Sequence, residues 1–320
     1  MSRIFVSILY GFLLLILSCS TPKKESLNLI SQKIITKVPS ASGVHYLNGS
    51  IWLIGDDAMD IFQLDEDLQI ENQYQISSIR NTEEGRIIKS IKADFESMDF
   101  FDSKLLILGS GSKIISRDTA VLFDLKSREI ISKINIRSLF NHLMEIGNID
   151  TAVSINIEGF ASDQNYFYLL HRGNIDGNNN VYRIQKEDFI HYIKIQEIPH
   201  VDCFTFQLPK IEGYLSGFSG ACVSPDHKYL LFTSSVEATT DVYHDGEVLG
   251  SFIGYIPLEE IDSLSKLMSW PLKDDGIILK TKLESLSVIE QVEGRFKLIC
   301  VSDNDNGQSG VYHIDMNIKK

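Results

Sequence analysis

Cysteine is scarce in this sequence, which limits the disulfides it can form. The 320 residues include four cysteines, and three of them, Cys203, Cys222 and Cys300, lie beyond the N-terminal region. Three thiols cannot form a complete disulfide framework, and Cys222 and Cys300 lie in apolar, strand-like runs, so buried free thiols are expected. One disulfide among the three is the alternative if the compartment is oxidising. No spacing of His and Cys fits a zinc site.

The sequence also has fewer basic residues than acidic ones. Lys and Arg number 30 against 43 Asp and Glu, which gives a formal net charge of −13. Proteins that bind nucleic acid need a basic surface, so this balance excludes nucleic acid as a partner. An excess of carboxylates favours cations, ligands with cationic groups, or simple solubility.

The sequence has only one long apolar run, and it lies at the N-terminus. Arg3 precedes the run from Ile4 to Leu17, which has the length of a secretory signal core and is too short for a membrane-spanning helix. The run closes in Ile16-Leu17-Ser18-Cys19, which resembles the lipobox of bacterial lipoproteins. That resemblance implies cleavage before Cys19 and acylation of Cys19. An ordinary signal peptide that happens to end in a cysteine is the alternative.

This start predicts three parts: a signal peptide over residues 1–18, a lipidated tether over 19–29 and a single domain over 30–320. The lipid on Cys19 would attach the protein to a membrane of the bacterial cell envelope. No acidic run follows Cys19 in "STPKKES". This favours a periplasm-facing protein at the outer membrane over one displayed on the cell surface.

The domain contains a repeated segment. Each copy has a Glu or Ser, a short apolar run, a polar turn and a second apolar run, and the copies begin at Ser42, Glu96, Glu158, Ser219 and Glu284. Short strands in units of this size predict an all-β fold, a single β-propeller with blades of four strands. Five copies predict five blades. Six blades are the alternative if one interval hides a degenerate copy.

Two further features complete the expected architecture. The segment "SQKIITKV" near the start of the domain is predicted to pair with "GVYHID" near its end, which would close the ring and leave no free sheet edge. Apolar residues recur at helical spacing in residues 136–147 and 257–268. Short inter-blade helices packed on the core are therefore expected in both stretches.

The acidic residues of the repeats are candidates for a metal site. Inner strands of a propeller run along the central axis, so equivalent residues of successive blades converge at one mouth of the channel. Calcium suits a ring of carboxylates there because it accepts many oxygen ligands in loose geometry. The alternative is that these side chains accept hydrogen bonds from backbone amides of the next blade. The predicted metal ligands are Glu96, Glu158, Glu284, Asp94 and Asp303.

Polar residues at the strand ends are predicted to form a second ring. Whether the two rings share one face depends on strand direction, which the sequence leaves open. Lys113, Arg117, Arg172 and Lys282 are candidates for holding a phosphate or carboxylate group. The alternative is that such cations only neutralise the acids beside them. The predicted ligand-binding residues are Arg117, His171, Arg172, Lys282 and Glu237.

The entries into the blades, "DFES", "NIEG" and "KLES", resemble those of the phytase-like and SdiA-regulated β-propellers, and longer stretches resemble a lipoprotein branch of the Bacteroidota near that group. The resemblance implies a propeller of five or six blades and calcium-assisted phosphoester hydrolysis. Residues for catalysis do not carry over, and Ser42 and Ser219 replace two of the carboxylates. The expected function is therefore binding of a small anionic or polar ligand, or a partner protein, at the central mouth. A calcium-dependent phosphoester hydrolase is the alternative.

Overall fold

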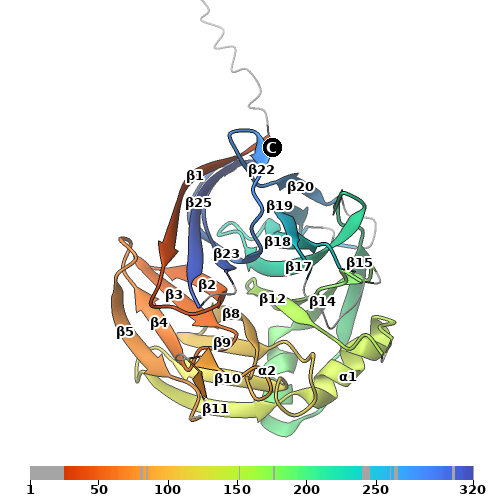
Figure 1. Cartoon of the computed structure of the whole chain (residues 1–320). Helices are drawn as coiled ribbons and strands as arrows, with labels where there is room; N and C mark the ends of the chain where they lie inside the picture. Colours follow the sequence, from red (N-terminus) through yellow and green to blue (C-terminus); the bar gives the residue numbers. More distant parts are fainter. Residues whose placement is uncertain are drawn as a thin grey trace, which may run out of the picture.

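The computed structural model describes residues 25–79, 82–83, 86–150, 152–175, 177–239, 246–259, 261–262, 266–304 and 307–319. Five antiparallel sheets stand around a central axis as the blades of a propeller (Figure 1). This confirms the expected all-β fold and the expected number of five blades.

Consecutive strands pair within each blade, with the innermost strand given first here. The first blade contains β2 (Ala41–Leu47), β3 (Ser50–Gly55), β4 (Asp60–Leu64) and β5 (Ile70–Gln75), and the second contains β8 (Phe95–Phe101), β9 (Lys104–Gly109), β10 (Thr119–Asp124) and β11 (Glu129–Asn135). The third contains β12 (Ile157–Ser162), β13 (Tyr166–His171), β14 (Asn179–Gln185) and β15 (Val201–Phe206).

The last two blades have additional features. The fourth contains β17 (Tyr214–Val223), β18 (Tyr229–Glu237), β19 (Val248–Pro257) and β20 (Met268–Pro271), with the short β16 (Lys210–Ile211) beside β17. The fifth contains β23 (Leu283–Val292), β24 (Arg295–Asp303), β25 (Ser309–Asn317) and, from the other end of the chain, β1 (Ser26–Ile35). Two hairpins lie outside the blades: β6 (Thr82–Glu83) with β7 (Arg86–Ile87), and β21 (Lys273–Asp274) with β22 (Ile277–Ile278).

The sequences of the middle strands are continuous apolar runs, because both faces of a blade pack against neighbouring blades. In β9, all four residues from Leu105 to Leu108 are fully buried. Successive side chains of a strand point to opposite faces. Leu106 and Leu108 accordingly join the apolar cluster shared with the third blade, and Leu105 and Ile107 join the one shared with the first.

The ring closes in the expected way. The inner strands contact one another in the cycle β2, β8, β12, β17, β23 and back to β2. β1 pairs with β25, from Ser31 opposite His313 to Ile34 opposite Gly310, which confirms the predicted closing pair. The strand already begins at Ser26, so residues 26–29 belong to the fifth blade and not to a tether. Leu27 and Leu29 pack against the core of that blade, which explains why the strand extends this far.

The helices were predicted only in part. α1 (Arg137–Ile146) confirms the first expectation and buries Leu139, Phe140 and Leu143. The second expectation, over residues 257–268, is wrong for the part of that stretch that the structure describes. β19 ends at Pro257 and β20 begins at Met268, with no helix in the described residues between them. α2 (Lys186–Ile195) was not expected, and it buries Phe189 and Tyr192.

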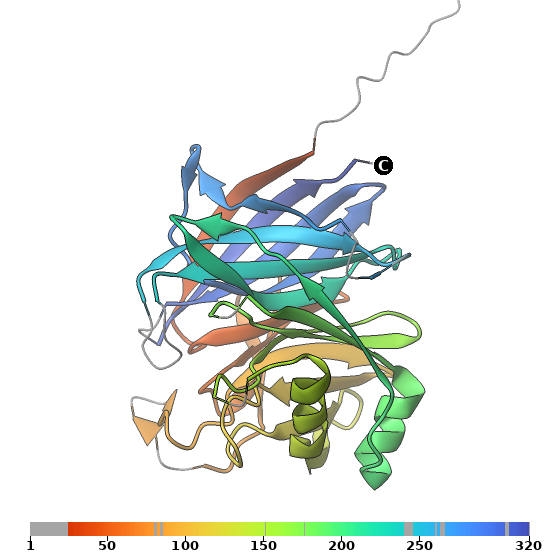
Figure 2. The same ribbon diagram turned by 90° about the vertical axis from the view of Figure 1, so that its right-hand side faces the viewer.

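The two ends of the described chain lie close together on the fifth blade. In the side view, the start of β1 and the C-terminus lie at the top, and the β6–β7 hairpin projects at the lower left (Figure 2). Cys203, Cys222 and Cys300 are free thiols. No helix among the described residues is long and apolar enough to cross a membrane.

Candidate functional site

Every inner strand has the same irregularity, near its start in four blades and in the middle of the longer β17. The pairing register shifts by one residue at Ser42, Glu96, Glu158, Ser219 and Glu284, the first residues of the five sequence repeats. A bulge of this kind leaves one residue without a direct partner in the ladder and re-aims its side chain. The repeat seen in the sequence therefore marks the point where each blade bends toward the channel.

The residues before each bulge are divided between the core and the channel. The residue immediately before it is apolar and buried: Ala41, Phe95, Ile157, Phe218 and Leu283. In four blades the residue two positions before it is polar and lines the central cavity: Ser40, Asp94, Asn156 and Lys282. The entries "DFES", "NIEG" and "KLES" thus place two polar groups in the channel and one apolar side chain between blades.

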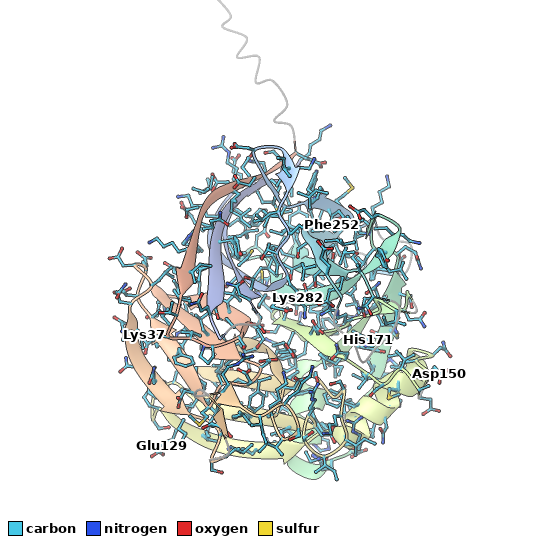
Figure 3. All side chains as sticks on the ribbon, in the orientation of Figure 1. Lys37, Glu129, Asp150, His171, Phe252 and Lys282 are labelled. Carbon is cyan, nitrogen blue, oxygen red and sulfur yellow. The ribbon has the colours of Figure 1, made fainter. Side chains whose placement is uncertain are left out.

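A cavity of about 1310 Å³ occupies this end of the channel. Its walls include the starts of inner strands and the ends of second strands, since antiparallel pairing places Ile157 opposite His171, for example. The two expected rings therefore share one face. Lys282 lies near the middle of the ring, and His171 lies further out toward the third blade (Figure 3). All ten predicted site residues line the cavity: Asp94, Glu96, Arg117, Glu158, His171, Arg172, Glu237, Lys282, Glu284 and Asp303.

The described part of the cavity wall carries many charged side chains, with acidic and basic residues in almost equal number. Its eight carboxylates face seven lysines and arginines, and it includes no Phe, Tyr or Trp. Charges of both signs in one wall can form ion pairs, which lowers the cost of burying them. The acids are Asp56, Asp57, Asp94, Glu96, Glu158, Glu237, Glu284 and Asp303, and the bases are Arg86, Lys89, Lys92, Lys113, Arg117, Arg172 and Lys282.

Arg172 organises one side of the cavity. Its Nη1 donates to both carboxylate oxygens of Glu158 at 3.1 and 2.9 Å, and its Nη2 donates to Glu237 Oε2 at 2.7 Å. Lys282 Nζ lies 3.1 Å from Glu284 Oε1 and 3.5 Å from Glu237 Oε1. These contacts join the third, fourth and fifth blades through buried, charge-assisted hydrogen bonds. The glutamates here bind cationic side chains rather than the backbone amides considered as an alternative.

Lys92 organises the other side. Its Nζ contacts Asp56 Oδ2 and lies 2.9 Å from Asp94 Oδ1. The second oxygen of Asp94 accepts hydrogen bonds from Arg117 Nη1 at 2.6 Å and Ser110 Oγ at 2.5 Å. Burial opposes ionisation of Asp94, yet Lys92 and Arg117 together hold its pKa below its usual value. Asp94 is therefore a fixed carboxylate anchor between two cations.

Glu96 differs from the other axial glutamates because its carboxyl group makes no direct contact with a described cationic side chain, although the charge of Lys92 lies near enough to interact with it. No described residue forms a hydrogen bond or ion pair with its carboxyl group. Burial, followed by the charges of Asp94, Glu158, Asp56 and Glu284, holds the pKa of Glu96 well above its usual range. Its neighbour Asp56 also has a pKa raised by burial, to about 6. The raised pKa favours the neutral, protonated form of Glu96 over its carboxylate.

In the first and fourth blades, the residue at the bulge is a serine, and its hydroxyl group bonds to the neighbouring blade. Ser42 Oγ donates to the backbone carbonyl of Phe95, next to Glu96. Ser219 Oγ donates to the carbonyl of Leu283 at 2.6 Å, next to Glu284. The two hydroxyl groups therefore support the bulges that carry Glu96 and Glu284.

The predicted calcium site does not fit these contacts. Within the described part of the chain, one group of three carboxylates has ligand atoms within 4.8 Å of one another: Asp56, Asp94 and Glu96. Lys92 already bridges two of them, and Arg117 holds the remaining oxygen of Asp94. Glu158 and Glu284 are engaged by Arg172 and Lys282, and Asp303 lies elsewhere on the wall. A divalent ion at the triad would have to displace an ammonium group.

Two important residues did not appear among the predicted site residues. Asp56 was expected only among the polar strand-end residues of the second ring, and Lys92 was not expected at the site at all. Lys92 stands two positions before Asp94, in the connection that leads into "DFES". A lysine beside a repeat entry is a weak signal, because its partner Asp56 is 36 residues away in the sequence.

The fold and cavity define a five-bladed β-propeller with a charged central pocket. The chain belongs to the Family of unknown function (DUF6929), which matches residues 37–316. A search of the curated proteins gives no match.

Solved structures with a similar fold include a glutaminyl cyclase from Myxococcus xanthus, at 8% identity over 93% of this chain and 100% of that one with a TM-score of 0.49. Virginiamycin B lyase from Staphylococcus aureus has 7% identity over 91% of this chain and 99% of that one, with a TM-score of 0.38. Hydrazine synthase from Kuenenia stuttgartiensis has 10% identity over 84% and 78%, with a TM-score of 0.43. Likenesses of this size carry no argument about activity.

Proposed function

We propose that this protein is a ligand-binding propeller whose central cavity holds a small polar ligand with both hydrogen-bond donors and acceptors. The supporting observation is the cavity at the axis, about 1310 Å³ in volume, whose described wall carries eight carboxylates and seven lysines and arginines. Charged groups of both signs supply hydrogen-bond donors and acceptors for such a ligand.

The residues that line the cavity limit the classes of ligand that it can bind. The described wall has no aromatic ring on which a nucleobase or the face of a sugar could stack. Charged and polar groups dominate it instead, which favours a ligand that is itself charged. A partner protein that inserts a polar segment into the mouth is the second occupant that this chemistry suits.

We further propose that the lipid on Cys19 holds the propeller at a membrane of the cell envelope, on the periplasmic side of the outer membrane. Cys19 lies outside the described residues. Support comes from the direction of β1: Ser26 pairs with Asn317, while the other end of β25 begins at Ser309, which accepts the Ala41 N–H beside the cavity. A tether leading to Ser26 then approaches from the end remote from the mouth, and the mouth faces away from the membrane.

A thermal-shift screen tests the binding proposal. A fragment of residues 25–320 contains all five blades and is the starting protein. We expect at least one compound from a panel of amino acids, short peptides, sugar phosphates and polyols to raise its unfolding midpoint. The Glu96→Gln/Arg117→Gln double variant should lose that rise, and Glu290→Gln, in an exposed ion pair with Lys297, should keep it. A panel without effect, or a rise that survives the cavity substitutions, contradicts the proposal.

A calcium-dependent phosphoester hydrolase is the second candidate, favoured by the close approach of Asp56, Asp94 and Glu96. It requires Lys92 to leave its place between two of these carboxylates. Calcium-dependent turnover of phosphate esters that Lys92→Ala accelerates and Glu96→Gln abolishes would support this activity over simple binding.

A further inference from the structure

Two loops of the second blade form an exposed apolar surface at the cavity mouth. They are residues 88–92, before β8, and residues 112–117, after β9, and we call them the rim. Ile91, Ile114 and Ile115 are 37%, 68% and 82% exposed, and Ile115 is the most exposed large apolar residue in the described part of the chain. Single apolar residues on a surface need no explanation, but a group of them marks an interaction surface.

The two loops of the rim are joined, and both are basic. Lys113 Nζ donates to the backbone carbonyl of Ser90 at 3.0 Å, which places Ile91 and Ile114 on the two sides of this hydrogen bond. The loop sequences "IKSIK" and "SKIISR" contain lysine and arginine and no acidic residue. Lys89 and Lys113 are exposed. The rim is therefore a basic surface on a chain whose net charge is −13.

The backbone at Ile115 has a conformation that isoleucine avoids. Its φ angle is 78°, and a positive φ at a β-branched residue occurs only where the surroundings impose it. The Ile115 N–H donates to Asp118 Oδ2 at 2.7 Å. Asp118 is buried and contacts Arg137, which also donates to the carbonyl of Gly111 at 2.6 Å. The fold thus fixes an apolar side chain in solvent at a conformational cost, as is common at functional sites.

The rim is also fixed to the cavity wall. Arg117 Nη1 donates to Ser112 Oγ at 2.7 Å and to Asp94 Oδ2 at 2.6 Å. Because these contacts already order the loop, a molecule that docks on the rim meets a preformed surface, and little entropy is lost on binding.

We infer that the rim docks a partner protein through an acidic segment that also carries aliphatic side chains. Carboxylates of such a segment complement Lys89 and Lys113, and its aliphatic groups cover the isoleucines. A symmetric pair of copies fits less well, because it would place one basic rim against another. A membrane reached by a lipid on Cys19 would lie at the end of β1 remote from the mouth. The inference goes beyond the proposed ligand, since the isoleucines lie outside the cavity wall.

Panning a random peptide library against the immobilised 25–320 fragment tests the inference. We expect the enriched peptides to be acidic and to contain Leu, Ile or Val. One enriched peptide, carrying a fluorophore, is then titrated with the fragment and its variants, and binding is followed by fluorescence anisotropy. Enrichment of neutral or basic peptides, or of none, overturns the inference.

Substitutions in the rim and matched controls locate the peptide. Ile115→Asn removes the apolar side chain and suits the backbone, because asparagine adopts positive φ more readily. This variant should keep its thermal midpoint and weaken peptide binding by roughly tenfold or more. Lys113→Glu should weaken binding by a similar factor, most strongly at low salt. Ile131→Thr, at a residue 52% exposed on β11 of the same blade, and Lys126→Glu should bind as the unsubstituted fragment does. Binding that survives both rim substitutions overturns the inference.

Two further measurements test the other occupants. Vesicles of phosphatidylglycerol in a cosedimentation assay test a lipid surface, and size-exclusion chromatography tests a second copy. Lipid binding or a dimer that Ile115→Asn abolishes would replace the partner protein and overturn the inference. The Ile115→Asn fragment should still respond to any compound that the thermal-shift screen identifies. A loss of that response would show that the rim and the ligand site are one site, against the inference.

Discussion

The raised pKa of Glu96 predicts how the free energy of unfolding depends on pH. Its pKa is raised in the folded protein, and its ordinary value is 4.5. The folded state therefore holds a proton that the unfolded chain has lost, and the stability contributed by Glu96 is present below pH 4.5 and decreases as the pH rises. The linkage relation sets the loss of unfolding free energy at no more than about 1.4 kcal/mol per pH unit, as the pH rises from 4.5 toward the raised pKa of Glu96 in the folded protein.

Glu96→Gln removes this titration and keeps the shape of the protonated acid. Urea unfolding of the 25–320 fragment at pH 5, 6 and 7 measures the effect. The variant should gain stability relative to the unsubstituted protein as the pH rises, by at most about 1.4 kcal/mol for each pH unit, whatever their difference at pH 5. Glu290→Gln, which lies outside the cavity, should show no such trend. Stability curves that stay parallel from pH 5 to 7 would refute the raised pKa of Glu96.

Three further predictions concern the charges and the ring. Arg172→Met leaves Glu158 and Glu237 buried without their shared cation and should cost about 3–5 kcal/mol in urea unfolding. Adding Glu158→Gln and Glu237→Gln should recover much of that loss, and no recovery would contradict the account. Calcium and chelator should leave the thermal midpoint unchanged, whereas Lys92→Ala should make it rise with calcium. Deleting Ser26–Ile35 should lower the midpoint by about 10 °C and cause self-association in size-exclusion chromatography, because it exposes the edge of β25; a monomer of unchanged stability would argue against closure by this strand.

Much of the architecture was predictable because the repeat is tied to a physical feature. A Glu or Ser beginning each repeat marks the bulge where an inner strand enters the channel, so aligned repeats gave both the number of blades and the residues that meet on the axis. The closing pair between β1 and β25 was also predictable, since a ring without a partner for its last blade leaves an open edge.

The failures come from information that a single segment does not contain. The helix α2 is an exception, because Phe189, Tyr192 and Ile193 in "KEDFIHYIKI" recur at helical spacing and the helix buries Phe189 and Tyr192. The stretch after Pro257 has helical spacing, yet Ile261 is held by a core cluster within an irregular connection.

The role of Lys92 depends on Asp56 and Asp94, which approach each other only when two blades stand side by side. The sequence thus predicted which residues gather at the mouth but not which of them pair. The same reason applies to Glu96, because only the assembled ring shows that its carboxyl group forms no ion pair with a described residue.

The pairing of β1 with β25 has a consequence for how the molecule is made. Ser31 and His313 lie side by side although 282 positions separate them in the chain, so the first strand to be synthesised waits for the last. Contacts of such long range are slow to form. While the chain is still being synthesised, at most four blades are complete, and an apolar face of the incomplete ring is exposed. Such an intermediate is prone to aggregate. The ring can therefore close only after β25 has been synthesised.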